Sequence, residues 1–232
     1  MGARIRPQNL KTCLVVGGDS SLFPDIYARF QADGWRVFGT SRRENNHFRD
    51  DFLFFDGVNT EQFVSQIEMY EFSAVIFCIG GLGGKSLPDY NDNLIETTVE
   101  SNLTSVLKAV RVVLPFLENE ASIILISSIA ACAGSYDDVY AAAKAGVVGL
   151  TKSLARNSTR GVRVNCICPG LIEGSSMAGE FKSEQILKHI SETPTGELVS
   201  KPDLAEICFD LCKPAWRSAN GAVIHVNGGR YV

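Results

Sequence analysis

The alternation of short apolar runs with longer amphipathic segments constrains the fold of this chain more than any other feature. Seven runs have the length and composition of strands: Thr12–Val16, Trp35–Gly39, Phe52–Phe55, Ala74–Ile79, Ser122–Ser127, Val162–Ile167 and Ala222–Val226. The segments between them are typical of helices: Leu22–Ala32, Glu61–Met69, Thr97–Leu117, Asp138–Asn157, Lys182–Ile190 and Asp203–Leu211. This alternation predicts a doubly wound α/β fold, with a mostly parallel sheet and helices on both faces. No linker or repeat divides residues 1–232, so we expect a single domain.

The composition excludes several classes of protein. Hydrophobic residues make up 45% and charged residues 21% of the chain, which is ordinary for a globular protein. A net charge of −4 argues against nucleic acid or an anionic membrane surface as a partner. No apolar run is long enough to span a bilayer, and no apolar segment follows the basic N-terminal residues as in a secretory signal.

Seven cysteines are scattered through apolar segments. Cys166 and Cys168 can share one face of a strand, and Cys208 and Cys212 one face of a helix, so a zinc site is conceivable. Neither pair has the spacing of common structural zinc sites, and we expect buried apolar side chains and no metal. Free thiols without a signal sequence predict a cytoplasmic protein.

The residues that follow each strand are candidate ligand contacts, because such sheets bind ligands at the carboxyl ends of their strands. After the first strand, a turn from Gly17 to Leu22 can bring the backbone close to a pyrophosphate at a helix N-terminus. An ordinary turn can have the same sequence. The candidate pyrophosphate contacts are Gly17, Asp19, Ser20, Ser21 and Leu22.

The second strand is followed by Ser41, Arg42 and Arg43, with no carboxylate in that segment. An arginine at this place suits the 2′-phosphate of NADP, whereas an acidic residue would favour NAD. We therefore expect Ser41 and Arg42 to contact NADP, and Arg43 can share the role. The alternatives are a solvated surface arginine and the cofactor NAD.

The third and fourth strands are followed by two further groups of candidate cofactor contacts. Asp56, before Gly57, can accept a hydrogen bond from an adenine amino group or cap a turn. After Cys78 and Ile79, the glycines that begin at Gly80 leave room for a cofactor to pass close to the backbone.

The strongest chemical signal is Tyr140 and Lys144, which lie four residues apart on a predicted helix and so share one face. A phenol has a pKa of about 10, and a nearby ammonium favours its phenolate. We therefore expect Lys144 to lower the pKa of Tyr140 into the range for acid–base catalysis. Ser127 and Ser128 close the preceding strand, where a hydroxyl can bind a substrate oxygen.

Together these motifs resemble the short-chain dehydrogenase/reductase family over nearly the whole chain. The matching residues are Gly17, Asp56, Gly80, Gly81, Asn102, Ser128, Tyr140, Lys144, Pro169, Gly170, Gly228 and Gly229. The resemblance implies a Rossmann fold and hydride transfer between NADP(H) and the carbonyl or secondary alcohol of a small molecule. It also implies a homodimer or homotetramer, and a substrate covered by residues 171–190.

The resemblance further implies a role for each site residue. Tyr140 is the acid–base group, Lys144 also holds the nicotinamide ribose, Ser128 polarises the substrate oxygen, and Asn102 supports a proton path through water. The remaining cofactor contacts that the resemblance implies are Tyr140, Lys144, Pro169, Gly170 and Ile172.

Three departures from the family pattern leave alternatives open. Ser21 and Phe23 replace two glycines of the first turn, and Phe23 should require an adjusted helix. Cys78, Ile79 and Gly80 replace the usual Asn-Ala-Gly, and a strict count to Tyr140 selects Ser127 as the catalytic serine. We prefer Ser128, because it fits the end of the strand. The departures also leave room for an NAD-dependent alcohol dehydrogenase of the family, or for a cofactor-binding regulator with little turnover.

Overall fold

A seven-stranded parallel sheet forms the centre of the computed structural model, which describes residues 10–43 and 51–232. The strand order is β3-β2-β1-β4-β5-β6-β7, and it confirms the predicted doubly wound fold. The strands are β1 (Thr12–Val16), β2 (Arg36–Ser41), β3 (Phe52–Phe54), β4 (Phe72–Phe77), β5 (Leu117–Ile126), β6 (Arg163–Pro169) and β7 (Val223–Val226). The first nine residues, which bear on the question of a secretory signal, lie outside the described part.

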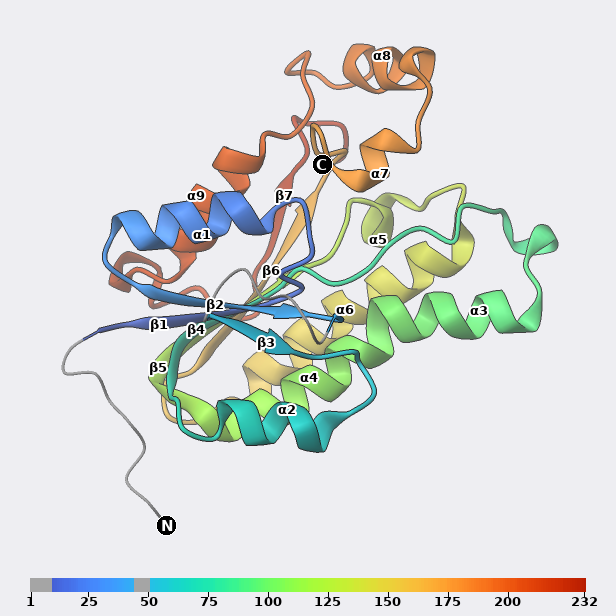
Figure 1. Cartoon of the computed structure of the whole chain (residues 1–232). Helices are drawn as coiled ribbons and strands as arrows, with labels where there is room; N and C mark the ends of the chain where they lie inside the picture. Colours follow the sequence, from blue (N-terminus) through green and yellow to red (C-terminus); the bar gives the residue numbers. More distant parts are fainter. Residues whose placement is uncertain (1–9, 44–50) are drawn as a thin grey trace.

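Helices cover both faces of the sheet (Figure 1). On one face α1 (Phe23–Ala32) lies beside α9 (Lys201–Leu211), and on the other lie α2 (Thr60–Ile67), α4 (Ser105–Val113) and α6 (Asp138–Asn157). The remaining helical elements are α3 (Asp92–Val99), α5 (Ala130–Ala133), α7 (Ser176–Gly179), α8 (Ser183–Ser191), a π-helical turn (Glu100–Thr104) and short 3₁₀ turns at Leu87–Asp89, Leu114–Phe116 and Pro214–Trp216. No helix in the described ranges is both long and apolar enough to cross a membrane.

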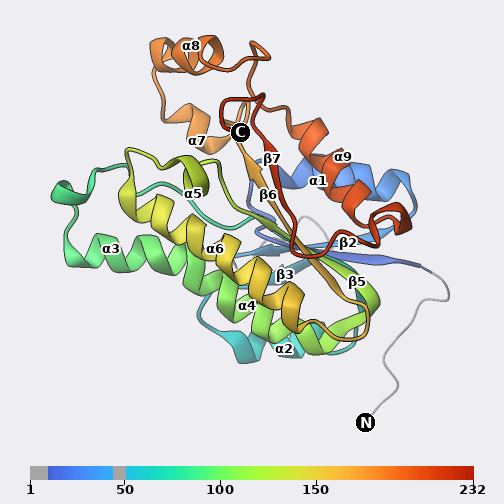
Figure 2. The ribbon, with the colours of Figure 1, turned by 180° about the vertical axis from the view of Figure 1, so that it is seen from behind.

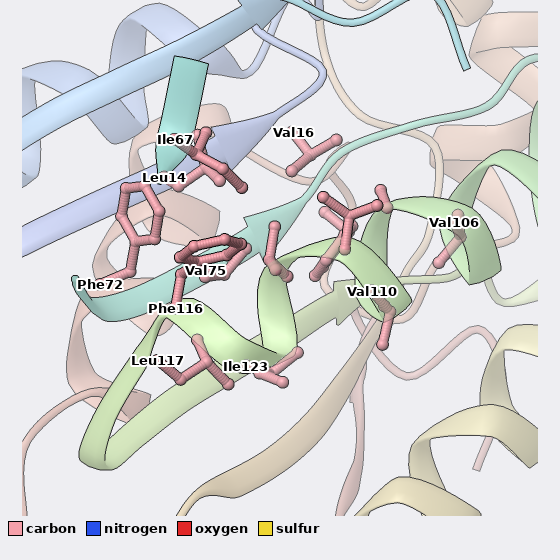
Figure 3. Packing of buried hydrophobic residues seen from close by; sticks show 14 of the residues in the cluster. Leu14, Val16, Ile67, Phe72, Val75, Val106, Val110, Phe116, Leu117 and Ile123 are labelled. Carbon is pink, nitrogen blue, oxygen red and sulfur yellow. The ribbon is translucent and has the colours of Figure 1, made fainter. Parts of the chain in front are cut away.

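Side chains of the central strands are buried on both faces, as a parallel sheet between two helical layers requires. Leu14, Val75 and Ile123, from three neighbouring strands, pack against Val106 and Val110 of α4 (Figure 3). All three strand residues have no exposed area, and burying a side chain of this size contributes about 1.5–3 kcal/mol. This core fixes the strand ends, and therefore the positions of the residues that follow them.

The helix predicted at 97–117 differs from the structure at both ends. In the structure the helix begins at Asp92, because Asn91 caps it by accepting a hydrogen bond from the Leu94 N–H at 2.8 Å. At its other end the α-helix stops at Val113 and a 3₁₀ turn containing Pro115 leads into β5. The π-helical turn in the middle contains Asn102, one of the predicted site residues.

Phe23, which was expected to require an adjusted helix, packs into the interface between α1 and β2. The helix α1 begins at Phe23, with Pro24 in its first turn, and the phenyl ring is buried against β2. Gly39 of β2 makes the room, because a Cβ at that position would lie 2.8 Å from the Phe23 ring. Phe52 packs edge-on against the same ring, with the centroids 5.1 Å apart.

The segment predicted to cover the substrate forms α7 and α8 beyond the ends of β6 and β7 (Figure 2). Phe181, between the two helices, contacts Tyr136 in the loop before α6, with ring centroids 6.5 Å apart. Ser176 of α7 reaches the cavity at the carboxyl edge of the sheet. The segment therefore contacts the loop before α6 and reaches the rim of the cavity.

Candidate active site

A cavity of about 510 Å³ opens at the carboxyl ends of β1 to β4. Nine predicted cofactor contacts line it: Gly17, Asp19, Ser20, Arg42, Asp56, Gly57, Cys78, Ile79 and Gly80. Eight others do not: Ser21, Leu22, Ser41, Tyr140, Lys144, Pro169, Gly170 and Ile172. Thr97, Glu100, Ser101 and Ser105 also line the cavity and were not predicted, because helical spacing alone does not show which face meets the strand ends. The volume is within the usual range for a ligand pocket.

Gly17 lets the ends of β1 and β4 approach each other. Its φ is +105°, and a Cβ would lie 2.6 Å from the carbonyl oxygen of Cys78. Its N–H donates to the Thr40 hydroxyl at 3.0 Å, which ties the turn to β2. The turn thus puts backbone, rather than side chain, along the wall of the cavity before the N-terminus of α1.

Asp19 brings a carboxylate to the end of β2, contrary to the expectation that no acidic group stands there. It accepts hydrogen bonds from the Ser41 hydroxyl and from the Arg42 N–H, both at 3.1 Å. The carboxylate comes from the turn after β1, so the sequence around Arg42 does not reveal it. Asp19 and the Arg42 side chain therefore both face the place predicted for a 2′-phosphate.

Asp56 caps the turn that follows β3, one of the two roles predicted for it. One carboxylate oxygen accepts from the N–H groups of Val58 and Asn59, at 2.7 and 2.8 Å. These backbone hydrogen bonds hold the pKa of Asp56 below its usual value, and the one from Asn59 has the largest effect. Asp56 also lines the cavity, so this turn shapes its wall.

Ser128, rather than Ser127, faces Tyr140. The Ser128 side chain lies close enough to the Tyr140 phenol to lower its pKa. The Ser127 hydroxyl instead donates to the backbone carbonyl of Lys144 at 2.8 Å. Both serines are buried, and only Ser128 has its hydroxyl where the phenol could share a substrate oxygen with it.

The electrostatics of Tyr140 and Lys144 differ from the sequence prediction. Burial raises the pKa of Tyr140 to about 12, the Ser128 side chain opposes this, and the Asp137 charge adds to it. Burial lowers the pKa of Lys144 to about 8. The Lys144 ammonium lies 5.8 Å from the Tyr140 ring centroid and donates to the carbonyls of Ile79 and Ile126. In the protein alone, burial therefore outweighs the lowering of the Tyr140 pKa that we expected from Lys144.

Asn102 and Gly80 hold the end of β4 against the helical layer. Asn102 is fully buried and exchanges two hydrogen bonds with the backbone of Gly81, at 2.8 and 3.1 Å. A Cβ on Gly80 would lie 2.3 Å from the Asn102 side-chain oxygen and 2.8 Å from the Lys144 ammonium. The predicted site residues from β4, the π-helical turn and α6 thus meet at Gly80.

Asp137 is a site residue that we did not predict. It is fully buried, and it accepts from the N–H groups of Gly83 and Gly84, both at 2.8 Å, and from the Tyr90 hydroxyl at 2.5 Å. It also caps α6 by accepting from the Tyr140 N–H at 3.0 Å. Its place directly before the helix is the only sequence signal for such a cap. Asp137 thereby attaches the glycine loop after β4 to the helix that carries Tyr140.

A parallel sheet with a cavity at its carboxyl edge, and a buried tyrosine, lysine and serine beside it, is the arrangement of a Rossmann-fold oxidoreductase. A family model described as enoyl-(acyl carrier protein) reductase matches residues 60–230. The chain is 31% identical to the 3-oxoacyl-acyl-carrier-protein reductase FabG of Vibrio cholerae, over 96% of this chain and 98% of the relative. The FabG of Escherichia coli is 29% identical over 96% and 98%.

Solved structures show the same fold. A short-chain dehydrogenase/reductase of Brucella melitensis, titled glucose/ribitol dehydrogenase, matches with a TM-score of 0.87 at 24% identity, covering 96% of this chain and 97% of that one. The chain belongs to the short-chain dehydrogenase/reductase family. It is an oxidoreductase that acts on carbonyl or alcohol groups.

Proposed function

We propose that the protein reduces the carbonyl group of a 3-oxoacyl thioester with NADPH. The hydroxyl pair of Tyr140 and Ser128 carries this proposal, because it can bind one carbonyl oxygen from two sides. The nicotinamide of the cofactor, when bound, supplies the hydride to the carbonyl carbon. Tyr140 donates its proton to the oxygen, Ser128 orients that oxygen, and Lys144 supports the proton donor and the ribose of the cofactor. Asn102 holds the end of β4 in place.

The residues around the cavity fit a dinucleotide. The Gly17 turn offers backbone at the N-terminus of α1 for a pyrophosphate, and Arg42 offers a guanidinium for an adenosine phosphate. Gly80 and Gly81 keep the wall at the end of β4 free of side chains. Pro169, Gly170 and Ile172 remain proposed contacts of the cofactor beyond this cavity.

Two observations support an acyl substrate. The relatives that match the chain over nearly its whole length are named 3-oxoacyl-acyl-carrier-protein reductases. Tyr136, whose exposed fraction is 53%, and Phe181 also place aromatic rings between the substrate-covering segment and the start of α6. Aromatic rings at that place offer apolar surface that an acyl chain can cover.

Steady-state assays of the purified full-length protein test this function. We expect NADPH oxidation with acetoacetyl-CoA, and faster oxidation with a 3-oxoacyl chain on acyl carrier protein. Crotonyl-CoA, an enoyl thioester without the 3-oxo group, serves as the control and should give no turnover. Reduction of the enoyl thioester alone would contradict the proposal, and NADPH binding without turnover on any carbonyl would favour a regulator.

The cofactor preference is a separate prediction. NADPH should bind more tightly than NADH by roughly tenfold to a hundredfold, because a charge-assisted hydrogen bond contributes about 1.5–3 kcal/mol. Arg42→Ala should remove most of this difference without weakening NADH. Asp19→Asn should strengthen NADPH binding, because it removes a negative charge that would repel an adenosine phosphate beside Ser41 and Arg42.

Fluorescence titration of both cofactors against the wild type and the two variants measures this preference. Arg43→Ala is the matched control, and it separates the neighbouring guanidinium from Arg42. If the wild-type protein binds NADH as tightly as NADPH, both arginines are ordinary surface residues and NAD is the cofactor.

We also infer a homodimer or homotetramer formed through α4 and α6. Leu107 of α4 has an exposed fraction of 43%, which suits a helix face that meets a second copy. The resemblance to the family supports the same assembly.

A further inference from the structure

Cys132, Cys168 and His225 form a cluster of metal-ligating side chains next to the proposed active site, where Cys168 lies close to Ser128 and Tyr140. Their two sulfur atoms and one imidazole nitrogen all lie within 4.8 Å of one another. The three residues come from α5, β6 and β7, and they are far apart in the sequence. For this reason the spacing of the cysteines along the chain gives no sign of them.

The sheet brings two of these residues together. Cys168 pairs directly with His225 in the parallel register of β6 and β7, and paired residues of neighbouring strands project to the same face. The helix α5 passes beside the ends of these strands and adds Cys132 (Figure 2). The imidazole ring also packs against Tyr231, with ring centroids 5.2 Å apart, which limits its orientation.

The chemistry of the three ligands selects a soft divalent cation. Zn²⁺ binds thiolate sulfur at about 2.3 Å and imidazole nitrogen at about 2.0–2.1 Å in a tetrahedron, so its ligand atoms lie roughly 3.5–3.8 Å apart. Small rotations of the side chains would bring the present cluster to that spacing. Two thiolates cancel the charge of the cation, so the complex adds no net charge at the partly buried site.

Access and protonation also fit an ion that binds from solution. Cys132 and His225 are exposed and Cys168 is buried, so an ion can enter from the surface and keep one position open to water. A bound Zn²⁺ deprotonates coordinating thiols, so both cysteines would bind as thiolates.

We propose that Cys132, Cys168 and His225 bind one Zn²⁺ ion, with water as the fourth ligand. Binding releases the two thiol protons to solvent and involves no change of oxidation state. The ion would join α5 to the edge of the sheet. Because α5 begins two residues after Ser128, and the Ser128 hydroxyl accepts from the Ala130 N–H at 3.1 Å, the ion would also stiffen the turn that carries the serine.

A cobalt titration tests the proposal, because Co²⁺ replaces Zn²⁺ in tetrahedral thiolate sites and is coloured there. We expect the reduced, chelator-treated protein to bind one equivalent of Co²⁺ with thiolate charge-transfer absorption, and Zn²⁺ to abolish the signal. Cys132→Ser and His225→Ala should each weaken binding by at least about tenfold. Cys212→Ser is the matched control and should bind as the wild type does, since Cys212 is only partly exposed and packs with the core cluster on the α1 and α9 side.

Thermal unfolding gives a second readout that does not depend on activity. Zn²⁺ at about a hundred times its Kd should raise the Tm of the wild type by roughly 5–10 °C and leave that of Cys132→Ser nearly unchanged. A wild-type protein without thiolate-to-cobalt absorption would overturn the proposal. So would a cobalt spectrum and affinity that are the same in the wild type and in both ligand variants. Since Cys132 and His225 are exposed, neither substitution leaves a cavity in the core.

Discussion

Replacement of Tyr140 by Phe is expected to lower kcat by about 10²–10⁴-fold, the usual contribution of general acid–base catalysis. Tyr140 is 4% exposed and its side chain lies close to Ser128, so the substitution removes the proton donor and little else from the site. Cofactor affinity should remain nearly unchanged, because the ring stays in place. Steady-state rates with acetoacetyl-CoA, together with fluorescence titration of NADPH, measure the two effects separately.

Tyr136→Phe is the matched control for this experiment. Tyr136 lies in the loop directly before α6, but 53% of it is exposed, and it contacts Phe181 rather than Ser128. We expect this variant to change KM for the acyl substrate more than kcat. A Tyr140→Phe protein that keeps the kcat of the wild type would show that another group donates the proton.

Gly80→Ala is expected to damage both stability and activity. Gly80 has a φ of +130°, which costs an L-residue about 1–3 kcal/mol. The added Cβ would also overlap the Asn102 side chain and press on the Lys144 ammonium, at 2.3 and 2.8 Å. Since a displacement of about 1 Å in a catalytic group can lower a rate about 10²-fold, we expect kcat to fall by that order. Chemical denaturation and steady-state kinetics measure the two losses.

Gly81→Ala provides the control, because a Cβ at Gly81 would meet no atom within 4 Å. This variant should keep the stability and kcat of the wild type to within about 1 kcal/mol and a few-fold. Equal effects of the two substitutions would mean that the loop moves freely and that Gly80 does not position Lys144.

The fold was predictable because the strands that form it are buried on both faces and appear in the sequence as continuous apolar runs. Tyr140 and Lys144 were predictable for a local reason, since four residues on a helix bring two side chains to one face. The boundary at Asp92 was missed, because a polar first turn and its Asn91 cap do not show the apolar period. Such a start depends on one side-chain hydrogen bond.

Other parts of the candidate site could not be predicted, because they depend on contacts between distant segments. The carboxylate of Asp19 reaches the end of β2 only because β1 and β2 are neighbours in the sheet. Asp137 holds Gly83, Gly84 and Tyr90, which precede it by about fifty residues in the chain. The low pKa of Lys144 results from burial, which its sequence neighbours do not determine.

The contact between Phe23 and Gly39 bears on how the glycine-rich turn after β1 can be identified in a sequence. At the interface of α1 and β2 there is room for one large side chain, and here the helix contributes it and the strand contributes the glycine. A side chain larger than glycine at position 39 should therefore be tolerated only with a smaller residue at position 23. A pattern that requires every glycine within the turn itself would pass over such chains, whereas a pattern that scores the two positions jointly would retain them.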